Sequence, residues 1–198
     1  MDLEPMQAKI VRCMNVFIYF SRHIKEEMLR HLKDHLENDG LLIIGTNSFG
    51  IQSRYVVYKK KIDDLILHEF AFSLDNLGHI SIMPWFTIHD KDPEAILLAE
   101  LSRTIGSAAS FWTRFKRHLD QLLEYYGFCK RKTDGFLHFP KETMLPNKFL
   151  EKNALLWREM QGKGYLEGAV AVLKEAGYDP WINPAGDIAI RPSTDIFS

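Results

Sequence analysis

The chain has 198 residues, of which 46% are hydrophobic and 26% charged, and its formal net charge is −1. A chain of this length and composition builds one large soluble domain, or one domain with an appendage. The near-neutral charge gives no support for binding to nucleic acid or to an anionic membrane surface. Two widely separated cysteines argue against a disulfide framework, and no apolar run approaches the roughly 20 residues that span a bilayer. We therefore expect a protein of the reducing cytoplasm.

The chain opens with a pattern of strand, helix, turn and strand. The segment AKIVRCM (Ala8–Met14) is apolar and partly β-branched, which predicts a buried strand. A helix follows from Ser21, its predicted N-cap, to Asn38. The sequence NDG then supplies a stop with positive φ, and LLIIG (Leu41–Gly45) is typical of a strand covered on both faces. Such a unit forms a right-handed crossover between two parallel strands.

The predicted helix has one apolar stripe and otherwise charged faces. The stripe repeats every four residues, the spacing that a helix lying on a sheet requires. It consists of Ile24, Met28, Leu32 and Leu36. Charged side chains fill the other faces, namely Lys25, Glu26, Arg30, Lys33 and Asp34.

Further strands are predicted between residues 53 and 90. The segment SRYVVYKKK (Ser53–Lys61) is one of them, and two more form a hairpin, from Leu65 to Leu74 and from His79 to Asp90. A parallel start followed by antiparallel strands is a mixed sheet, and the fold class is therefore α/β. Beyond residue 90 the pattern becomes mostly helical, with a linker at residues 139–146. We expect a half-domain at residues 1–90 and a helical α+β extension at residues 91–198.

The extension contains an aromatic helix and a short final pair of strands. In residues 110–128, Phe111, Phe115, Leu119 and Leu122 share one helix face. Aromatic and basic residues alternate there, as in some nucleic-acid binders, but a core-facing helix explains the pattern more simply. TDG near residue 134 predicts a hairpin turn, and two short strands flank NPAGD in the last segment. For that segment a lid, a substrate-selecting subdomain and a partner-docking surface all remain open.

His31 and His35 are the one pair of histidines at the i, i+4 spacing of metal ligands on a helix. The intervening sequence, HLKDH, lacks the glutamate of the zinc motif H-E-x-x-H, and the surrounding face is charged. We therefore expect a solvated helix face and no metal site.

Three segments carry a resemblance to a known family. RCMNVFIYF (Arg12–Phe20), LRHLKDHLENDGLLIIGTNSFG (Leu29–Gly50) and RYVVYKK (Arg54–Lys60) together resemble the C-terminal half of the Rossmann-like, S-adenosylmethionine-dependent methyltransferases. They are most similar to the type that methylates chemotaxis-receptor carboxylates. There a fourth strand runs into the motif C-R-N-V-hydrophobic-I-Y-F, and a helix, a fifth strand ending in glycine and a closing strand follow. The resemblance covers residues 10–61.

The resemblance implies two residues that bind the cofactor. By position, Asn15 would hydrogen-bond S-adenosylmethionine or orient the acceptor, and Tyr19 would lie beside the sulfonium, which an aromatic face attracts. The alternatives are that Asn15 caps a turn at the strand end and that Tyr19 packs under the helix. Met14 stands where the family has an arginine, so the charged donor of that position is missing.

The resemblance also implies an incomplete cofactor site. The family binds the cofactor mainly through a glycine-rich loop after its first strand and an acidic residue that ends its second. Neither precedes Ile10 in this sequence. We therefore expect a methyltransferase-family polypeptide with an unknown acceptor, either truncated or completed by a partner chain, that binds the cofactor weakly or not at all by itself. The alternative is a non-catalytic interaction module.

A missing first half would leave the strand near Ile10 as an open sheet edge with unpaired backbone groups. We expect a second copy in a homodimer, or an N-terminal partner chain, to cover this edge, with no membrane or nucleic-acid partner.

Overall fold

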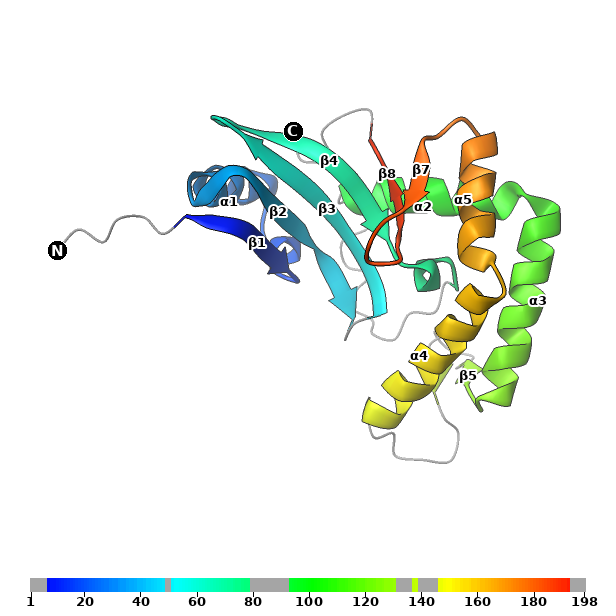
Figure 1. The fold of residues 1–198 in the computed structure, drawn as a ribbon. Coiled ribbons are helices and arrows are strands. Elements are labelled where there is room, and N and C mark those ends of the chain that lie inside the picture. Colours follow the sequence, from blue (N-terminus) through cyan, green and yellow to red (C-terminus); the bar gives the residue numbers. More distant parts are fainter. Residues whose placement is uncertain (1–6, 49–50, 79–92, 131–136, 139–145, 193–198) are drawn as a thin grey trace.

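The computed structural model describes residues 7–48, 51–78, 93–130, 137–138 and 146–192, and a twisted sheet forms its centre (Figure 1). The six strands of this sheet lie in the order β1-β2-β3-β4-β8-β7. They are β1 (Ala8–Met14), β2 (Leu36–Ser48), β3 (Ile51–Lys61), β4 (Asp64–Phe72), β7 (Pro180–Ile182) and β8 (Ile188–Ile190). β1 and β2 are parallel, and all other neighbours in the sheet are antiparallel. The predicted α/β class with a mixed sheet is therefore confirmed.

Helices make up most of the second part of the chain, as predicted. They are α1 (Arg22–Asp34), α2 (Pro93–Ser107), α3 (Ala109–Tyr125), α4 (Pro146–Gly162) and α5 (Tyr165–Glu175). Two 3-10 helices, η1 (Phe17–Tyr19) and η2 (Leu74–Gly78), follow β1 and β4. Among the helices of the described ranges, none is long and apolar enough to cross a membrane.

The opening crossover forms as the sequence predicts. Val11 pairs with Leu42, and Cys13 with Ile44, in a parallel register. The helix is shorter than predicted, because it ends at Asp34 and the next strand already begins at Leu36.

The early end of α1 has a local cause. The backbone N–H of Ala8, at the start of β1, donates to the carbonyl oxygen of His35 at 2.8 Å, which draws the chain into the sheet directly after the helix. Asp39 does have a positive φ, of 63°, but it lies within β2. Asp39 does not end the helix. It lies in the part of β2, between the partners of Ala8 and Ile10, where the pairing of β1 with β2 shifts its register.

The buried face of α1 is rotated relative to the prediction. Ile24, expected on the apolar stripe, is 41% exposed, whereas Lys25, expected on the charged face, is only 6% exposed. Lys25 is three positions before Met28 and seven before Leu32, and these spacings share one helix face. The aliphatic stem of a lysine covers apolar surface, so this face can include Lys25.

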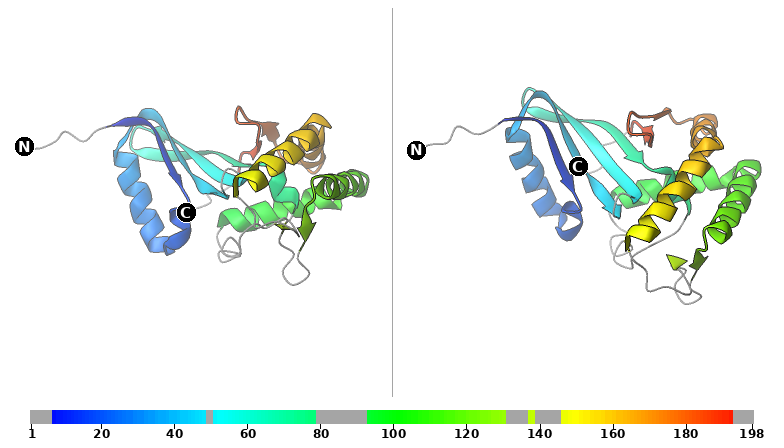
Figure 2. Two further views of the ribbon diagram at one scale, coloured as in Figure 1. Left: turned by 90° about the horizontal axis from the view of Figure 1, so that it is seen from below. Right: turned by 60° about the horizontal axis from the view of Figure 1, so that its bottom comes forward.

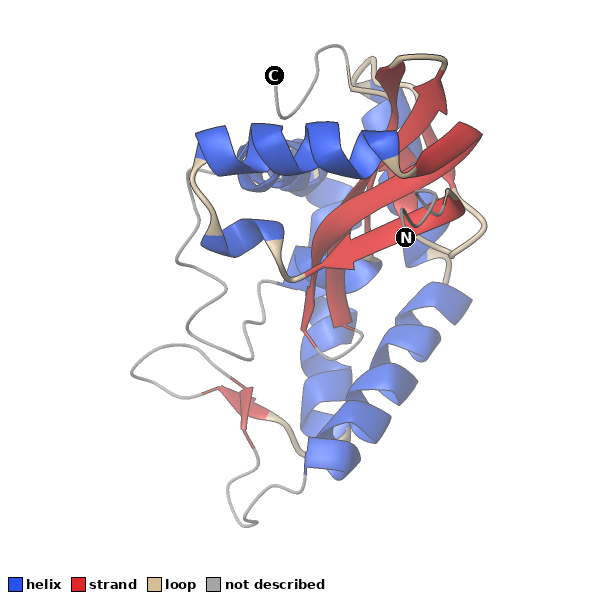
Figure 3. Cartoon of the chain, turned by 90° about the vertical axis from the view of Figure 1, so that its left-hand side faces the viewer, coloured by secondary structure: helices blue, strands red, loops and turns tan. Residues whose placement is uncertain are grey.

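α1 and α2 pack on the same face of the sheet, and the core lies between them and the strands (Figures 2 and 3). The sheet contributes alternate, fully buried side chains of β2, β3 and β4, and α2 adds Leu101 and Ile105. The predicted aromatic face of α3 is also in this core, since Phe111, Phe115, Leu119 and Leu122 are buried. The strand side chains are Leu42, Ile44, Val56, Tyr58, Phe70 and Phe72.

The C-terminal strands link the two parts of the chain. β7 and β8 flank NPAGD as predicted, and β8 pairs with β4, so that Phe70 lies opposite Ile190. The predicted hairpin near residue 134 is represented by β5 (Cys129–Lys130) and β6 (Leu137–His138), which are antiparallel. The predicted strand from His79 to Asp90 and most of the linker at 139–146 lie outside the described residues. The division at residue 90 stays a prediction.

Candidate functional site

Asn15 lies where β1 ends, beside the end of β2. Its backbone has a left-handed φ of 60°, and its N–H donates to the carbonyl oxygen of Gly45 at 2.8 Å. Its side-chain Oδ1 accepts a hydrogen bond from the backbone N–H of Asn47 at 2.9 Å, and its Nδ2 donates to Asn47 Oδ1 at 3.3 Å. Asn15 therefore ties the carboxyl ends of the two parallel strands together, and retains one side-chain N–H and one lone pair for another partner.

Tyr19 is the last residue of η1, and its ring is 75% exposed. The buried residue of this short helix is Phe17. The alternative interpretation, that Tyr19 packs under the helix, therefore does not describe this structure. Among the described residues, no hydrogen bond joins Tyr19 to Asn15, whose side chain bonds to Asn47 instead.

Exposed apolar side chains other than Tyr19 also occur between the start of β1 and the first turn of α1. Ile10, on β1 itself, is 60% exposed. Single exposed apolar side chains are normal on a protein surface, whereas a contiguous patch would mark a surface that another segment covers. The other members are Val16, Phe20 and Ile24.

The histidine pair of α1 has an ordinary structural arrangement. The rings of His31 and His35 are 4.5 Å apart, and His35 Nδ1 is 2.9 Å from the carbonyl oxygen of His31. No group of three or more metal-binding side chains occurs among the residues that the structure describes.

A polar network that the sequence does not reveal joins the C-terminal hairpin to β3 and β4. Asn183 Nδ2 donates to Tyr55 Oη at 2.8 Å and to Glu69 Oε1 at 3.1 Å, and Tyr55 Oη donates to Asp187 Oδ2 at 3.0 Å. Burial raises the pKa of Asp187 to about 6, although the Tyr55 hydrogen bond opposes this shift and the charges of Asp75 and Glu69 add to it. Burial also raises the pKa of Tyr55. These groups fix the hairpin, and their hydrogen-bonding capacity is largely used within the network.

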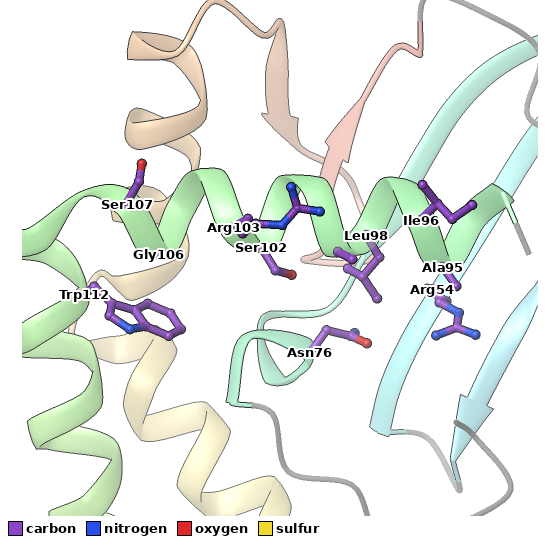
Figure 4. A pocket seen from close by; sticks show the side chains of 11 residues that line it. Arg54, Asn76, Ala95, Ile96, Leu98, Ser102, Arg103, Gly106, Ser107 and Trp112 are labelled. Carbon is purple, nitrogen blue, oxygen red and sulfur yellow. The ribbon is translucent and has the colours of Figure 1, made fainter. Parts of the chain in front are cut away.

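A cavity of about 840 Å³ is the second feature that sequence reasoning missed (Figure 4). It lies between α2, η2 and the start of β3, and Trp112 of α3 closes one end. Its described lining residues come mostly from α2, with others from β3, η2 and α3, and no local motif marks them.

Comparison with protein families supports the resemblance of the opening segment. Residues 4–61 match the family described as CheR methyltransferase, SAM binding domain. Neither the curated proteins nor the solved structures gave a significant match to the chain. The matched residues contain β1, α1, β2 and β3. This part of the chain is thus similar to the S-adenosylmethionine-binding domain of CheR-type methyltransferases, which supports a relationship to that enzyme family.

Proposed function

We propose that this chain supplies one side of an S-adenosylmethionine-dependent methyl-transfer site, and that a further polypeptide segment beside β1 completes the site. The observation that carries this proposal is the family match over residues 4–61, which coincides with the parallel β1–α1–β2 crossover. In open α/β sheets, ligands bind outside the carboxyl ends of the parallel strands. Asn15 lies at that position.

Asn15 and Tyr19 are the proposed cofactor contacts. Asn15 has one N–H and one lone pair left after its bonds to Asn47, which suit a carboxylate or a hydroxyl group of the cofactor. The exposed ring of Tyr19 offers a π face to the sulfonium cation. The chemistry that S-adenosylmethionine would supply here is a methyl group for a nucleophile of the acceptor, with S-adenosylhomocysteine as the leaving group.

The edge of β1 is the proposed place of completion. β1 is the terminal strand of the sheet among the described residues, and the apolar side chain of Ile10 on this strand is exposed. The proposed occupant is a strand of a second copy or of a separate N-terminal polypeptide. Either would pair with the outer backbone groups of β1 and bring further side chains to the crevice.

Calorimetric titration with S-adenosylmethionine, together with sedimentation equilibrium of the same sample, tests the proposal. We expect the monomer to bind weakly or not at all, because two side-chain contacts do not offset the entropy lost by a flexible ligand. Binding should appear only in the assembled form, and Asn15→Ala should weaken it there. Micromolar affinity in a monomeric sample would contradict the need for a completing segment.

A non-catalytic interaction module is the second candidate function. It is favoured by the bonds between Asn15 and Asn47, which give the amide of Asn15 a structural role. Transfer of a radioactive methyl group to any protein by the assembled form, lost in Asn15→Ala, would exclude this candidate.

A further inference from the structure

The outer edge of β1 pairs with no other strand in the part of the chain that the structure describes. β1 is the terminal strand of the sheet, and Figure 1 shows it at the margin with α1 behind it. The N–H of Asn15 donates to Gly45 on β2. Because the N–H groups alternate in direction along a strand, those of Ile10, Arg12 and Met14 point outward. An edge of this kind is a template for another strand.

The two faces of β1 differ in character. Val11 and Cys13 pack against the hydrophobic core. Ile10 and Arg12 lie on the opposite face, because side chains alternate along a strand, and both are exposed, Ile10 by 60%. A strand that pairs with this edge therefore has to place an apolar side chain beside Val11 and compatible side chains beside Ile10 and Arg12.

β1 itself meets these requirements when two copies of it run antiparallel. The strand spans residues 8–14, so its midpoint is Val11. A two-fold axis through Val11 pairs the whole strand with its copy. Val11 then faces the partner's Val11 on the core side, and Ile10 faces the partner's Arg12 on the other face.

The outward backbone groups also match in this register. Ile10 and the partner's Arg12 form a hydrogen-bonded pair, in which the two residues exchange both of their N–H···O=C bonds, and the two-fold axis repeats this pair. Val11 and the partner's Val11 form the non-hydrogen-bonded pair between them, whose side chains lie closer together. The backbone groups that β1 presents at its outer edge are thereby satisfied.

The neighbouring registers are less favourable. An axis through Arg12 would place two guanidinium groups directly opposite each other, and like charges in that position destabilise a strand pair. An axis through Cys13 would place Val11 opposite the partner's Asn15, whose φ of 60° is no longer extended. The axis through Val11 avoids both conflicts, because the charge of Arg12 then lies beside an aliphatic side chain.

We propose that two copies of this chain form a symmetric dimer through antiparallel pairing of β1 about Val11. The inference rests on the completion of the β1 edge in the proposed function, and it selects a second copy as the occupant. Because the strands are antiparallel, the amino end of the partner's β1 lies beside the carboxyl end of β1, next to Asn15. The second copy thus contributes to the site as well as to the sheet, and two-fold dimers are the commonest oligomers.

Cysteine scanning tests the register. In a Cys13→Ser, Cys129→Ser background, Val11→Cys should give a disulfide-linked dimer under mild oxidation, because the Cα atoms of a non-hydrogen-bonded pair are about 4.5 Å apart, within disulfide range. Arg12→Cys in the same background should stay largely uncrosslinked, and so should Cys13 in a chain that carries Cys129→Ser alone. A stronger crosslink at position 12 or 13 than at position 11 would overturn the register.

Sedimentation equilibrium of the full chain tests the dimer itself. We expect a monomer–dimer equilibrium at high micromolar concentration. Ile10→Lys places a second cation opposite the partner's Arg12, at two symmetric positions, and should weaken the dimer about tenfold. Ile62→Lys is the matched control, because Ile62 is 73% exposed and lies between β3 and β4, and it should leave the dissociation constant unchanged.

Two outcomes would overturn the dimer. They are a natural chain that stays monomeric at high micromolar concentration, and an unchanged dissociation constant in Ile10→Lys with an unchanged circular dichroism spectrum. The proposed function would then keep a separate polypeptide as its completing segment. A dimer that gives no heat with S-adenosylmethionine would instead contradict cofactor binding by the assembled form and leave the strand pairing in place.

Discussion

Asn15 and Asn47 bind each other through both a backbone and a side-chain contact, and so hold the carboxyl ends of β1 and β2 together. The two residues are 32 positions apart in the sequence. Their contact places a left-handed residue at the edge where ligands of open α/β sheets bind.

Substitution of Asn15 should separate its backbone role from its side-chain role. Asn15→Ala loses the bonds to Asn47 and places alanine at a φ of 60°, a left-handed conformation that asparagine tolerates better, so we expect a loss of about 2–4 kcal/mol in the free energy of unfolding. Asn15→Gly loses the same bonds but relieves the strain, and should be about 1 kcal/mol more stable than Asn15→Ala. Urea denaturation measures both. Equal stabilities would mean that the left-handed backbone carries no cost.

β2 and β3 approach each other closely at Gly45. A Cβ atom at this position would lie 2.2 Å from the carbonyl oxygen of Arg54 and 2.5 Å from Tyr55 Cβ. Gly45→Ala should therefore force the strands apart and cost about 1–3 kcal/mol or more of unfolding free energy. Gly162→Ala is the control, because nothing lies within 4 Å of its added Cβ and it ends a helix, where alanine is favoured. Thermal denaturation of the two variants should shift in opposite directions or leave Gly162→Ala unchanged.

Asp187 should make the protein less stable at neutral than at acidic pH. Its pKa of about 6 in the folded protein exceeds the ordinary 3.8, so the folded state binds the proton more tightly. The resulting stabilisation is complete below the unfolded pKa and is lost as the pH rises through about 6. The full loss is at most about 3 kcal/mol, and solvent screening reduces it because Asp187 is only partly buried.

Asp187→Asn keeps an acceptor for Tyr55 and removes the titration. The variant should be more stable than the natural chain near neutral pH and should lose less stability between acidic and neutral pH. Some dependence should remain, because burial also raises the pKa of Asp75. Urea denaturation at several pH values measures this, with Asp179→Asn, an exposed position, as the control. A pH profile identical to that of the natural chain would show that Asp187 does not couple folding to pH.

The proposed pairing at the β1 edge can be tested with proline substitutions at two positions whose backbone N–H groups point in opposite directions. The N–H of Asn15 points to β2, and alternation along the strand directs Val11 to β2 and Arg12 to the outer edge. Arg12→Pro should therefore weaken strand pairing with a second copy while the chain stays folded, whereas Val11→Pro should disrupt the ladder to β2 and unfold it. Sedimentation equilibrium and circular dichroism distinguish the two effects. A natural chain that stays monomeric at high micromolar concentration would leave a separate polypeptide as the proposed occupant.

The sequence predicted those features that depend on local periodicity. The β1–α1–β2 crossover, the buried face of α3 and the strands around NPAGD follow from apolar spacing and turn residues within short segments. It could not show the burial of Lys25, because whether the apolar stem of a lysine is buried depends on the packing around it.

Side-chain contacts between distant segments could not be predicted from the sequence either. Tyr55 and Asp187 are 132 positions apart, and no pattern indicates that their side chains meet. The same holds for the cavity, whose residues gather only when α2 lies over η2 and β3. For the predicted site, the sequence pattern indicated that Asn15 lies at the end of a strand. It did not indicate the hydrogen bonds to Asn47, which use much of the hydrogen-bonding capacity of the Asn15 side chain.

The position of β8 beside β4 has a consequence for biosynthesis. Because Phe70 pairs with Ile190, β4 leaves the ribosome more than a hundred residues before its neighbour, and until then one edge of β4 has no partner from β8. Contacts between such distant residues slow folding, and an uncovered apolar strand is prone to intermolecular pairing. The nascent chain should therefore depend on chaperones until residues 188–190 have emerged.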